Sequence, residues 1–316
     1  MGIRIAGVGS AIADYLYDHI DFSSRSFSKY QSKTPGDDGL VPGKLVLTDN
    51  FNEFVQRHAG VSMDEAVSEI TGNVEPTSFN LGGPAAAALI NTAQLLSNVD
   101  DSVAFYSANG NDRAGKQLRA ILEKTPVDIS HYVDHDTTSP YTIVLSDPSY
   151  QGGERTFLNN IGSSHCMLPD ALDQDFFDSD IRLFGGTALV PPIHNSLASL
   201  LAAGSGGINI VSTVYDFPNE KKHPDRYWPL GEDDRSYKLL DLLVMDAEEA
   251  KRLSGAGTID KARRILIDRG TAALAITQGR GDVIVYADGS KFAEADAAIP
   301  ISMTAESNDR SAPWDT

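Results

Sequence analysis

Cysteine is nearly absent from this 316-residue chain, and basic side chains are scarce relative to acidic ones. The single cysteine, Cys166, excludes an intrachain disulfide, which fits a reducing cytosol. An activated cysteine can be a nucleophile, but a lone cysteine is more often a small buried apolar side chain. Lysine and arginine number 26 against 44 aspartate and glutamate residues, so the net charge is −18 with neutral histidine. This balance argues against a nucleic-acid partner, because phosphate backbones are bound by clustered basic side chains.

Long apolar runs are absent too. No stretch approaches the roughly 20 apolar residues of a membrane span, and the N-terminus lacks the pattern of a secretory signal. We therefore expect a cytoplasmic protein with no membrane partner. The 41% of hydrophobic residues is enough to build a sizeable core, which excludes a disordered chain.

Short apolar runs alternate with helical spacing along most of the chain. The strand candidates lie at 3–9, 103–106, 181–184, 208–211, 242–245 and 273–276. The helix candidates lie at 84–96, 112–124, 193–203, 247–254 and 258–269. Alternating strands and helices predict an α/β fold, with a doubly wound, mostly parallel sheet and helices on both faces.

Other segments fall outside this alternation. Residues 141–146 and 155–158 form one hairpin candidate, and 283–286 with 291–293 form another. We expect one domain over residues 1–316, with a small β-rich lid formed from the segments near 15–50 and 130–160. A lid excludes water from a site and completes it.

Three local patterns suggest sites but have plainer explanations. Gly110 to Lys116 spells the start of a phosphate-binding loop, but Gln117 replaces the Mg²⁺-binding hydroxyl, and Asp112 is a good helix cap. Gly7-x-Gly9 lacks the third glycine of a dinucleotide site. The His131 to Asp136 cluster matches no common metal spacing, so solvated loop residues are the favoured interpretation.

An ordered set of motifs is more specific than any of these. It comprises Gly82-Gly83 before a small-residue helix, Gly110-x-Asp112-x-x-Gly115, Asp246-Ala247-Glu248-Glu249-Ala250, Thr277-x-Gly279-x-Gly281 and the terminal Asp315-Thr316. In this order the motifs resemble the ribokinase-like (PfkB-type) carbohydrate kinases over nearly the whole chain. The long segment before Gly82, including 39–44, is most similar to the adenosine-kinase-like branch.

The resemblance implies an ATP-dependent phosphotransferase that acts on a hydroxyl of a sugar or nucleoside. Asp14 matches the family aspartate that binds substrate hydroxyls, and a carboxylate is an acceptor suited to polyols. Gly82 and Gly83 match the diglycine that lets the sugar approach the main chain. The resemblance also implies that a homodimer can form through the lid.

For the cofactors, the resemblance implies ATP and Mg²⁺. Asp246 and Glu249 match an Asn-x-x-Glu motif that organises Mg²⁺ and phosphates, with Glu249 acting through water, and hard oxygen ligands are those that Mg²⁺ selects. Thr277, Gly279 and Gly281 match the region beside the nucleotide. Asp246 stands where asparagine is usual, so a cation is needed to compensate its charge.

Departures from the family pattern keep a second hypothesis open. Pro84 and Ala87 stand where asparagines usually hold the substrate. Asp315 and Thr316 begin the anion-hole motif, but the sequence contains no residue at the position of the catalytic base, and we expect the natural chain to continue past Thr316. A kinase-like protein that binds a sugar or nucleoside without phosphorylating it is therefore the alternative.

Overall fold

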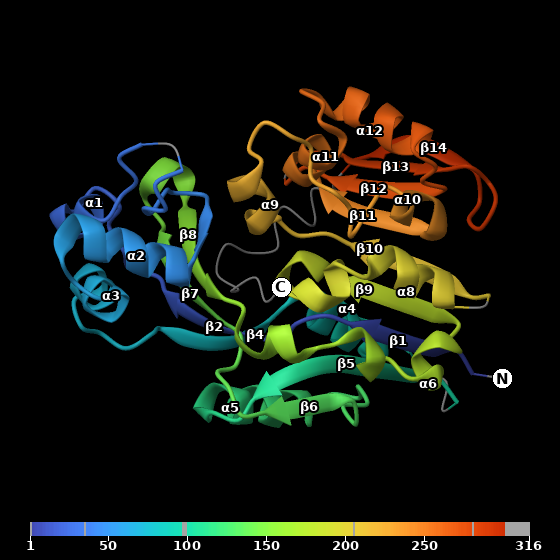
Figure 1. Cartoon of the computed structure of the whole chain (residues 1–316), viewed down its shortest axis with the longest axis horizontal. Coiled ribbons are helices and arrows are strands. Elements are labelled where there is room, and N and C mark those ends of the chain that lie inside the picture. The colour runs from blue at the N-terminus through green and yellow to red at the C-terminus, as the bar shows by residue number, and fades with distance from the viewer. Residues whose placement is uncertain (1, 35, 97–99, 205, 280, 301–316) are drawn as a thin grey trace.

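Nine strands form the larger of two sheets in the computed structural model, which describes residues 2–34, 36–96, 100–204, 206–279 and 281–300 (Figure 1). Their order is β14-β13-β12-β11-β10-β9-β1-β5-β6. The strands are β1 (Arg4–Val8), β5 (Ser102–Gly110), β6 (Tyr132–His135), β9 (Ile181–Gly185), β10 (Ile208–Ser212), β11 (Leu242–Asp246), β12 (Ala273–Thr277), β13 (Val283–Ala287) and β14 (Ala295–Ile299). The strands from β12 to β6 are parallel, and β13 and β14 are antiparallel.

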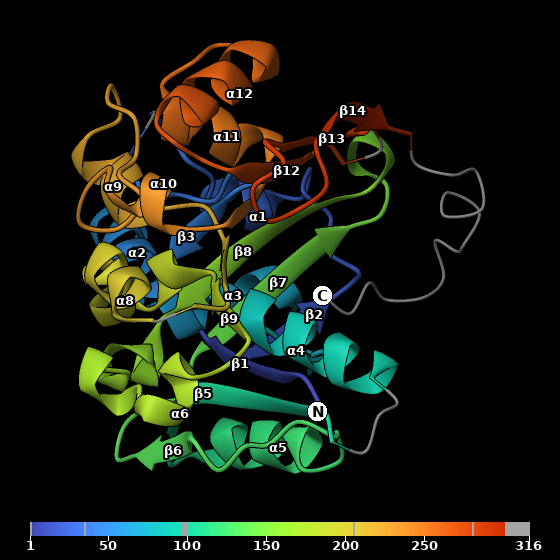
Figure 2. The same ribbon diagram turned by 90° about the vertical axis from the view of Figure 1, so that its right-hand side faces the viewer.

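Helices cover both faces of this large sheet, as predicted (Figure 2). On one face lie α4 (Pro84–Leu95) and α5 (Arg113–Leu122), and Leu89 and Leu122 pack with Phe105 in one core cluster. The other face is covered by α6 (Gln174–Phe177), α7 (Pro191–His194), α8 (Leu197–Ala203), α10 (Ser236–Leu239), α11 (Ala247–Ser254) and α12 (Ile259–Asp268). Among the described residues, none of the helices is long and apolar enough to cross a membrane.

A smaller sheet of five strands stands beside the large one (Figure 1). Its order is β3-β8-β7-β2-β4, from β3 (Leu45–Leu47), β8 (Glu154–Asn160), β7 (Tyr141–Asp147), β2 (Ile12–Tyr17) and β4 (Ser78–Gly82). Three helices cover its outer face, namely α1 (Arg25–Lys29), α2 (Thr48–Ala59) and α3 (Met63–Thr71). Val46, Leu145 and Leu158 share a core cluster with these helices. We call residues 12–82 and 141–160 the lid.

The lid differs in extent from the sequence-based expectation. It takes in residues 51–82, which the expected range 15–50 left out, because α2 and α3 bury their apolar faces against the small sheet. Conversely, β6 pairs with β5 in the large sheet although the expected lid range began at residue 130. The reason is Tyr132, whose ring stacks on Phe105 and whose hydroxyl donates to Asn109 at 2.7 Å.

Two other expectations need correction. The helix expected over 193–203 is broken into α7 and α8, because the Glu232 carboxylate accepts hydrogen bonds from the amides of Ala198 and Ser199 and so caps a new helix start. The last hairpin pairs β13 with β14 and not with 291–293. Ser290 donates to the Asp288 side chain, which lengthens the turn before the second strand begins.

Candidate active site

The chain passes from the large sheet into the lid at the carboxyl end of β1. Only residues 9–11 separate β1 from β2. In parallel α/β sheets, ligands bind outside the carboxyl ends of the strands. The lid is therefore attached at the edge of the sheet where a site is expected, and the predicted site residues can be located relative to this edge.

Asp14 lies on β2, between the neighbouring strands β4 and β7. Burial raises the pKa of Asp14 to about 6, while a hydrogen bond from the Thr142 hydroxyl and the positive charge of Arg155 oppose this rise. Across the strand pair lies Gly82, where an added Cβ would stand only 2.1 Å from Asp14 Oδ2. A side chain at this position would displace the Asp14 carboxylate.

Gly83 brings the chain back from the lid to the large domain. Its φ of 105° is in the region that favours glycine, and an added Cβ would lie 2.0 Å from the Ser10 carbonyl oxygen. Gly83 is also the N-cap of α4, whose first turn begins with Pro84. The structure thus brings Asp14, Gly82 and Gly83 together, beside the two connections that follow β1 and precede α4.

Asp246 and Glu249 form a reciprocal cap at the start of α11. Glu249 N–H donates to Asp246 Oδ1 at 2.7 Å, and Asp246 N–H donates to Glu249 Oε2 at 2.9 Å. The Thr213 hydroxyl also donates to Oε2, at 2.7 Å. Burial and the nearby charge of Asp246 raise the pKa of Glu249. Glu249 Oε1 has no hydrogen-bond partner among the described residues, so it is the oxygen available to a ligand.

Thr277 and the glycines that follow it lie one strand further along the same edge. Asp246 and Thr277 are register partners at the ends of β11 and β12. Gly279, with φ of 59°, and Gly281 form the turn into β13, and Gly281 N–H donates to the Gln278 carbonyl. Three spacings of about 4.8 Å separate β11 from β1, so the ends of these two strands lie about 14 Å apart along the sheet edge.

The other local patterns receive structural explanations. Asp112 caps α5 by accepting from Gly115 N–H at 2.7 Å, and its second oxygen accepts from Ser139 N–H at 2.9 Å. The Gly115 amide of the candidate phosphate-binding loop is therefore taken up by the helix cap. The His131 ring stacks on Tyr106, and no group of three or more metal-ligating side chains occurs within the described ranges. Asp315 and Thr316, predicted to begin the anion hole, lie outside the described residues.

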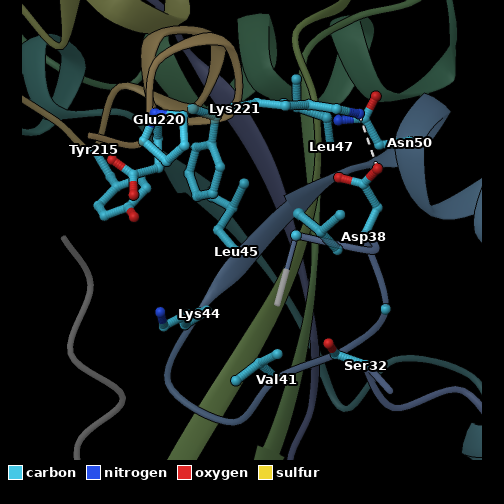
Figure 3. A pocket seen from close by; sticks show the side chains of 15 residues that line it. Ser32, Asp38, Val41, Lys44, Leu45, Leu47, Asn50, Tyr215, Glu220 and Lys221 are labelled. Atoms are coloured by element: carbon cyan, nitrogen blue, oxygen red, sulfur yellow. Dashed lines mark hydrogen bonds and ion pairs between the residues drawn. The ribbon is translucent and has the colours of Figure 1, made fainter. Parts of the chain in front are cut away.

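A cavity of about 470 Å³ lies between the lid and the large domain (Figure 3). Val41, Leu45 and Leu47 line it from the lid, and Tyr215 and Phe217 line it from the segment after β10. The helix α9 (Phe217–Lys222) borders it as well.

One ion pair crosses this cavity. Lys221 Nζ on α9 lies 2.8 Å from Asp38 Oδ2 in the lid (Figure 3). Sequence reasoning missed both residues, since no local pattern marks an ion pair between segments 183 positions apart. It also missed Thr142 and Asn159, although polar residues that interrupt apolar strands could have indicated them.

Comparisons with known proteins identify the family and the fold. A model of the pfkB family carbohydrate kinases matches residues 57–304. No curated protein matches the sequence significantly.

Several solved structures share the fold at low sequence identity. The adenosine kinase from Schistosoma mansoni in complex with 2-fluoroadenosine has a TM-score of 0.68 and 12% identity, covering 94% of this chain and 81% of that one. The Anopheles gambiae adenosine kinase has a TM-score of 0.66 and 16% identity, with coverage of 94% and 81%. The Arabidopsis thaliana ribokinase complexed with ribose and ATP has a TM-score of 0.59 and 16% identity, with coverage of 94% and 78%.

Proposed function

Because the chain belongs to the pfkB family of carbohydrate kinases, we propose that it transfers the γ-phosphoryl group of ATP to a hydroxyl of a sugar or nucleoside. The observation that carries this proposal is the arrangement of two residue groups at one sheet edge. Asp14, Gly82 and Gly83 lie on or just after the lid strands β2 and β4, beside the carboxyl end of β1, and Asp246, Glu249 and Thr277 lie at the ends of β11 and β12 and in the first turn of α11. A phosphate chain bound across this edge would join the two groups.

In this proposal Asp14 accepts hydrogen bonds from the substrate hydroxyls, and the bare main chain at Gly82 and Gly83 lets the substrate approach. Because Asp14 is partly buried, its carboxylate has fewer waters to displace than an exposed one, so the incoming hydroxyls replace less solvent. Phosphoryl transfer depends mainly on such positioning and on charge stabilisation.

Glu249 fits a role toward Mg²⁺. Its Oε1 is free, its Oε2 is held by two hydrogen bonds, and Mg²⁺ retains several waters when it binds phosphates through one or two carboxylates. When bound, Mg²⁺ supplies positive charge to the phosphates and compensates Asp246. Thr277, Gly279 and Gly281 would lie beside the nucleotide, and Asp315-Thr316 would begin the anion hole.

The function is tested by measuring ADP release from MgATP with a panel of sugars and nucleosides. We expect ADP release with at least one acceptor, and Asp14→Asn should reduce kcat/KM at least tenfold by removing the charged acceptor. Lys116→Ala is the matched control and should retain activity, because Lys116 is exposed in the first turn of α5, where Asp112 accepts from the Gly115 amide.

Pro84 and Ala87, which offer no side-chain amide to a substrate, favour one alternative outcome. Calorimetry that finds tight binding of a sugar or nucleoside, with no ADP release from any acceptor, would replace the kinase proposal by a non-catalytic binding protein. We also propose, from the resemblance alone, a homodimer formed through the lid, which sedimentation at several protein concentrations would test.

A further inference from the structure

Four polar side chains lie in one row across the lid sheet. Asn80, Asp14, Thr142 and Asn159 come from the adjacent strands β4, β2, β7 and β8, and each is the register partner of the next. Directly opposed residues project to the same face of a sheet. Leu158, the neighbour of Asn159, is buried against the lid helices, so the row is on the opposite face. Asp14 is therefore one member of a polar row.

Three members of this row are joined by directed hydrogen bonds. Asn159 Nδ2 donates to Thr142 Oγ1 at 2.9 Å. Because Oγ1 accepts this bond, its own proton is directed elsewhere. The Asp14 carboxylate is the register partner of Thr142 on the next strand, and a hydrogen bond from the Thr142 side chain lowers the pKa of Asp14. The ionised carboxylate can only accept. The order of donation therefore runs from Asn159 through Thr142 to Asp14.

The burial of this chain of donors is nearly complete. Thr142 is 6% exposed and Asn159 is 2% exposed. Asn159 Oδ1 is buried with no hydrogen-bond partner in the described part of the chain, an unfavourable arrangement for an amide. If the amide were turned over, Oδ1 would accept from Thr142, and Asp14 would lose its donor. The amide orientation that leaves Oδ1 unpaired is the one that gives Asp14 a donor.

We propose that Thr142 and Asn159 are positioning residues that keep the Asp14 carboxylate ionised and oriented toward the substrate hydroxyls. The role of Asp14 in binding hydroxyls rests on the function proposed above, whereas the effect of the two residues on Asp14 does not. Burial of Asp14 favours its protonated form, which would donate a hydrogen bond instead of only accepting. A fixed donor at Thr142 opposes that change.

One other group near Asp14 favours its ionised form. Arg155 on β8 is the charged side chain that acts on Asp14 among the described residues. On β4, Gly82 has no side chain and Asn80 does not titrate. The effect of Thr142 can therefore be separated from that of Arg155 by substitution.

The test is a carbon-13 NMR titration of the Asp14 side-chain carboxyl in the full chain without substrate, with the signal assigned by Asp14→Asn. Thr142→Val should raise the pKa of Asp14 by about one unit, as expected for the loss of one hydrogen bond to a charged group. Asn159→Leu should raise it less, and the double variant should match Thr142→Val alone, because Asn159 acts through Thr142.

Two further variants control for packing. Thr142→Ser keeps the hydroxyl and should restore the wild-type pKa. Thr156→Val removes a buried hydroxyl from the helix-covered face of the same sheet, where it donates to the carbonyls of Val41 and Lys44, and should leave Asp14 unchanged. If Thr142→Val does not fold, Asn159→Leu and Thr142→Ser still give the comparison. An unchanged pKa in Thr142→Val, or in Asn159→Leu when only that variant folds, would overturn the proposal, as would additive shifts in the double variant.

The titration also separates this inference from the proposed function. If no acceptor is phosphorylated, the pKa shifts still decide the roles of Thr142 and Asn159. If an acceptor is found, Thr142→Val should raise its KM about threefold at pH 6.5, because a shift of one unit lowers the ionised fraction of Asp14 by that factor. The KM for ATP should stay unchanged, and the pH below which the acceptor KM rises should move upward by about one unit.

Discussion

Asp14 combines a proposed binding role with a cost to the fold. Its pKa is raised from 3.8 to about 6 by burial, so the folded chain holds the proton more tightly than the unfolded chain does. Stability supplied by this group is therefore present at low pH and is lost as the pH rises from about 4 to 6. Above pH 6 the protein retains a buried carboxylate that opposes folding.

Asp14→Asn should therefore stabilise the ligand-free protein at pH 8 while it weakens binding. The upper limit is about 3 kcal/mol, since each unit of pKa corresponds to about 1.4 kcal/mol. Most of the gain should disappear near pH 4, where Asp14 is protonated in the folded chain and about half protonated in the unfolded chain. Urea denaturation of the wild type and the variant at pH 4, 6 and 8 measures this, and a gain that does not depend on pH would contradict it.

The residues of the site were predictable to different degrees. Asp14, Gly82 and Gly83 were predicted from the sequence because each matches a residue of the family's sequence pattern. Thr142 and Asn159 were not, because their importance comes from the register of β7 against β2, which pairs residues more than 120 positions apart, and of β8 against β7. Strand register of this kind is not visible in local periodicity.

At the start of helix α11, Glu249 is both part of the helix cap and a proposed ligand contact. Glu249→Gln keeps an oxygen that can accept from Asp246 N–H and Thr213, so the capping arrangement can survive while the charge is lost. We expect unfolding stability to change by less than about 1 kcal/mol. The affinity for ATP should fall at least tenfold in the presence of Mg²⁺ and change little in its absence.

Calorimetric titration of ATP with and without Mg²⁺, beside thermal denaturation, measures both effects. Asp246→Ala is the companion variant that removes the reciprocal cap, and it should lower stability by about 1 kcal/mol. If Glu249→Gln binds ATP as tightly as the wild type when Mg²⁺ is present, Glu249 is not part of the proposed cation site.

Elements with strong local signals were predicted most accurately. The sequence placed a helix over 247–254, and α11 spans those residues because the cap at Asp246 and Gly255 in the left-handed conformation fix its two ends. By contrast, the break between α7 and α8 comes from Glu232, more than 30 residues away. The position of β6 likewise depends on contacts of Tyr132 with β5. Contacts between distant segments decide the cases that periodicity cannot.

At the scale of the whole molecule, Lys221 and Asp38 connect the large domain to the outer part of the lid. The Lys221 side chain is 51% exposed, and such pairs contribute at most about 1 kcal/mol to stability. Lys221→Asp should therefore alter unfolding stability little. It should increase amide hydrogen exchange in residues 36–47, because like charges would then face each other across the cavity.

The double variant Lys221→Asp with Asp38→Lys restores opposite charges and is the matched control. It should return the exchange rates of residues 36–47 toward those of the wild type, and high salt should reduce the difference between the single variant and the wild type. Equal exchange in all three proteins would show that the ion pair does not restrain the lid.

The neighbouring strands β2 and β4 also have an evolutionary consequence. Where the chain leaves β2 and enters β4, Thr77 donates to Asp18 at 2.6 Å and its amide donates to the Leu16 carbonyl at 2.7 Å. The 60 residues from 18 to 77 thus begin and end at one point, so their replacement by a shorter or longer segment changes the closure entropy only slightly. Asp14 precedes this segment and Gly82 follows it, so both residues lie between the segment and the large domain. A lineage could therefore exchange its outer lid, and with it one wall of the cavity, while it inherits Asp14 and Gly82, the residues of the proposed substrate site, unchanged.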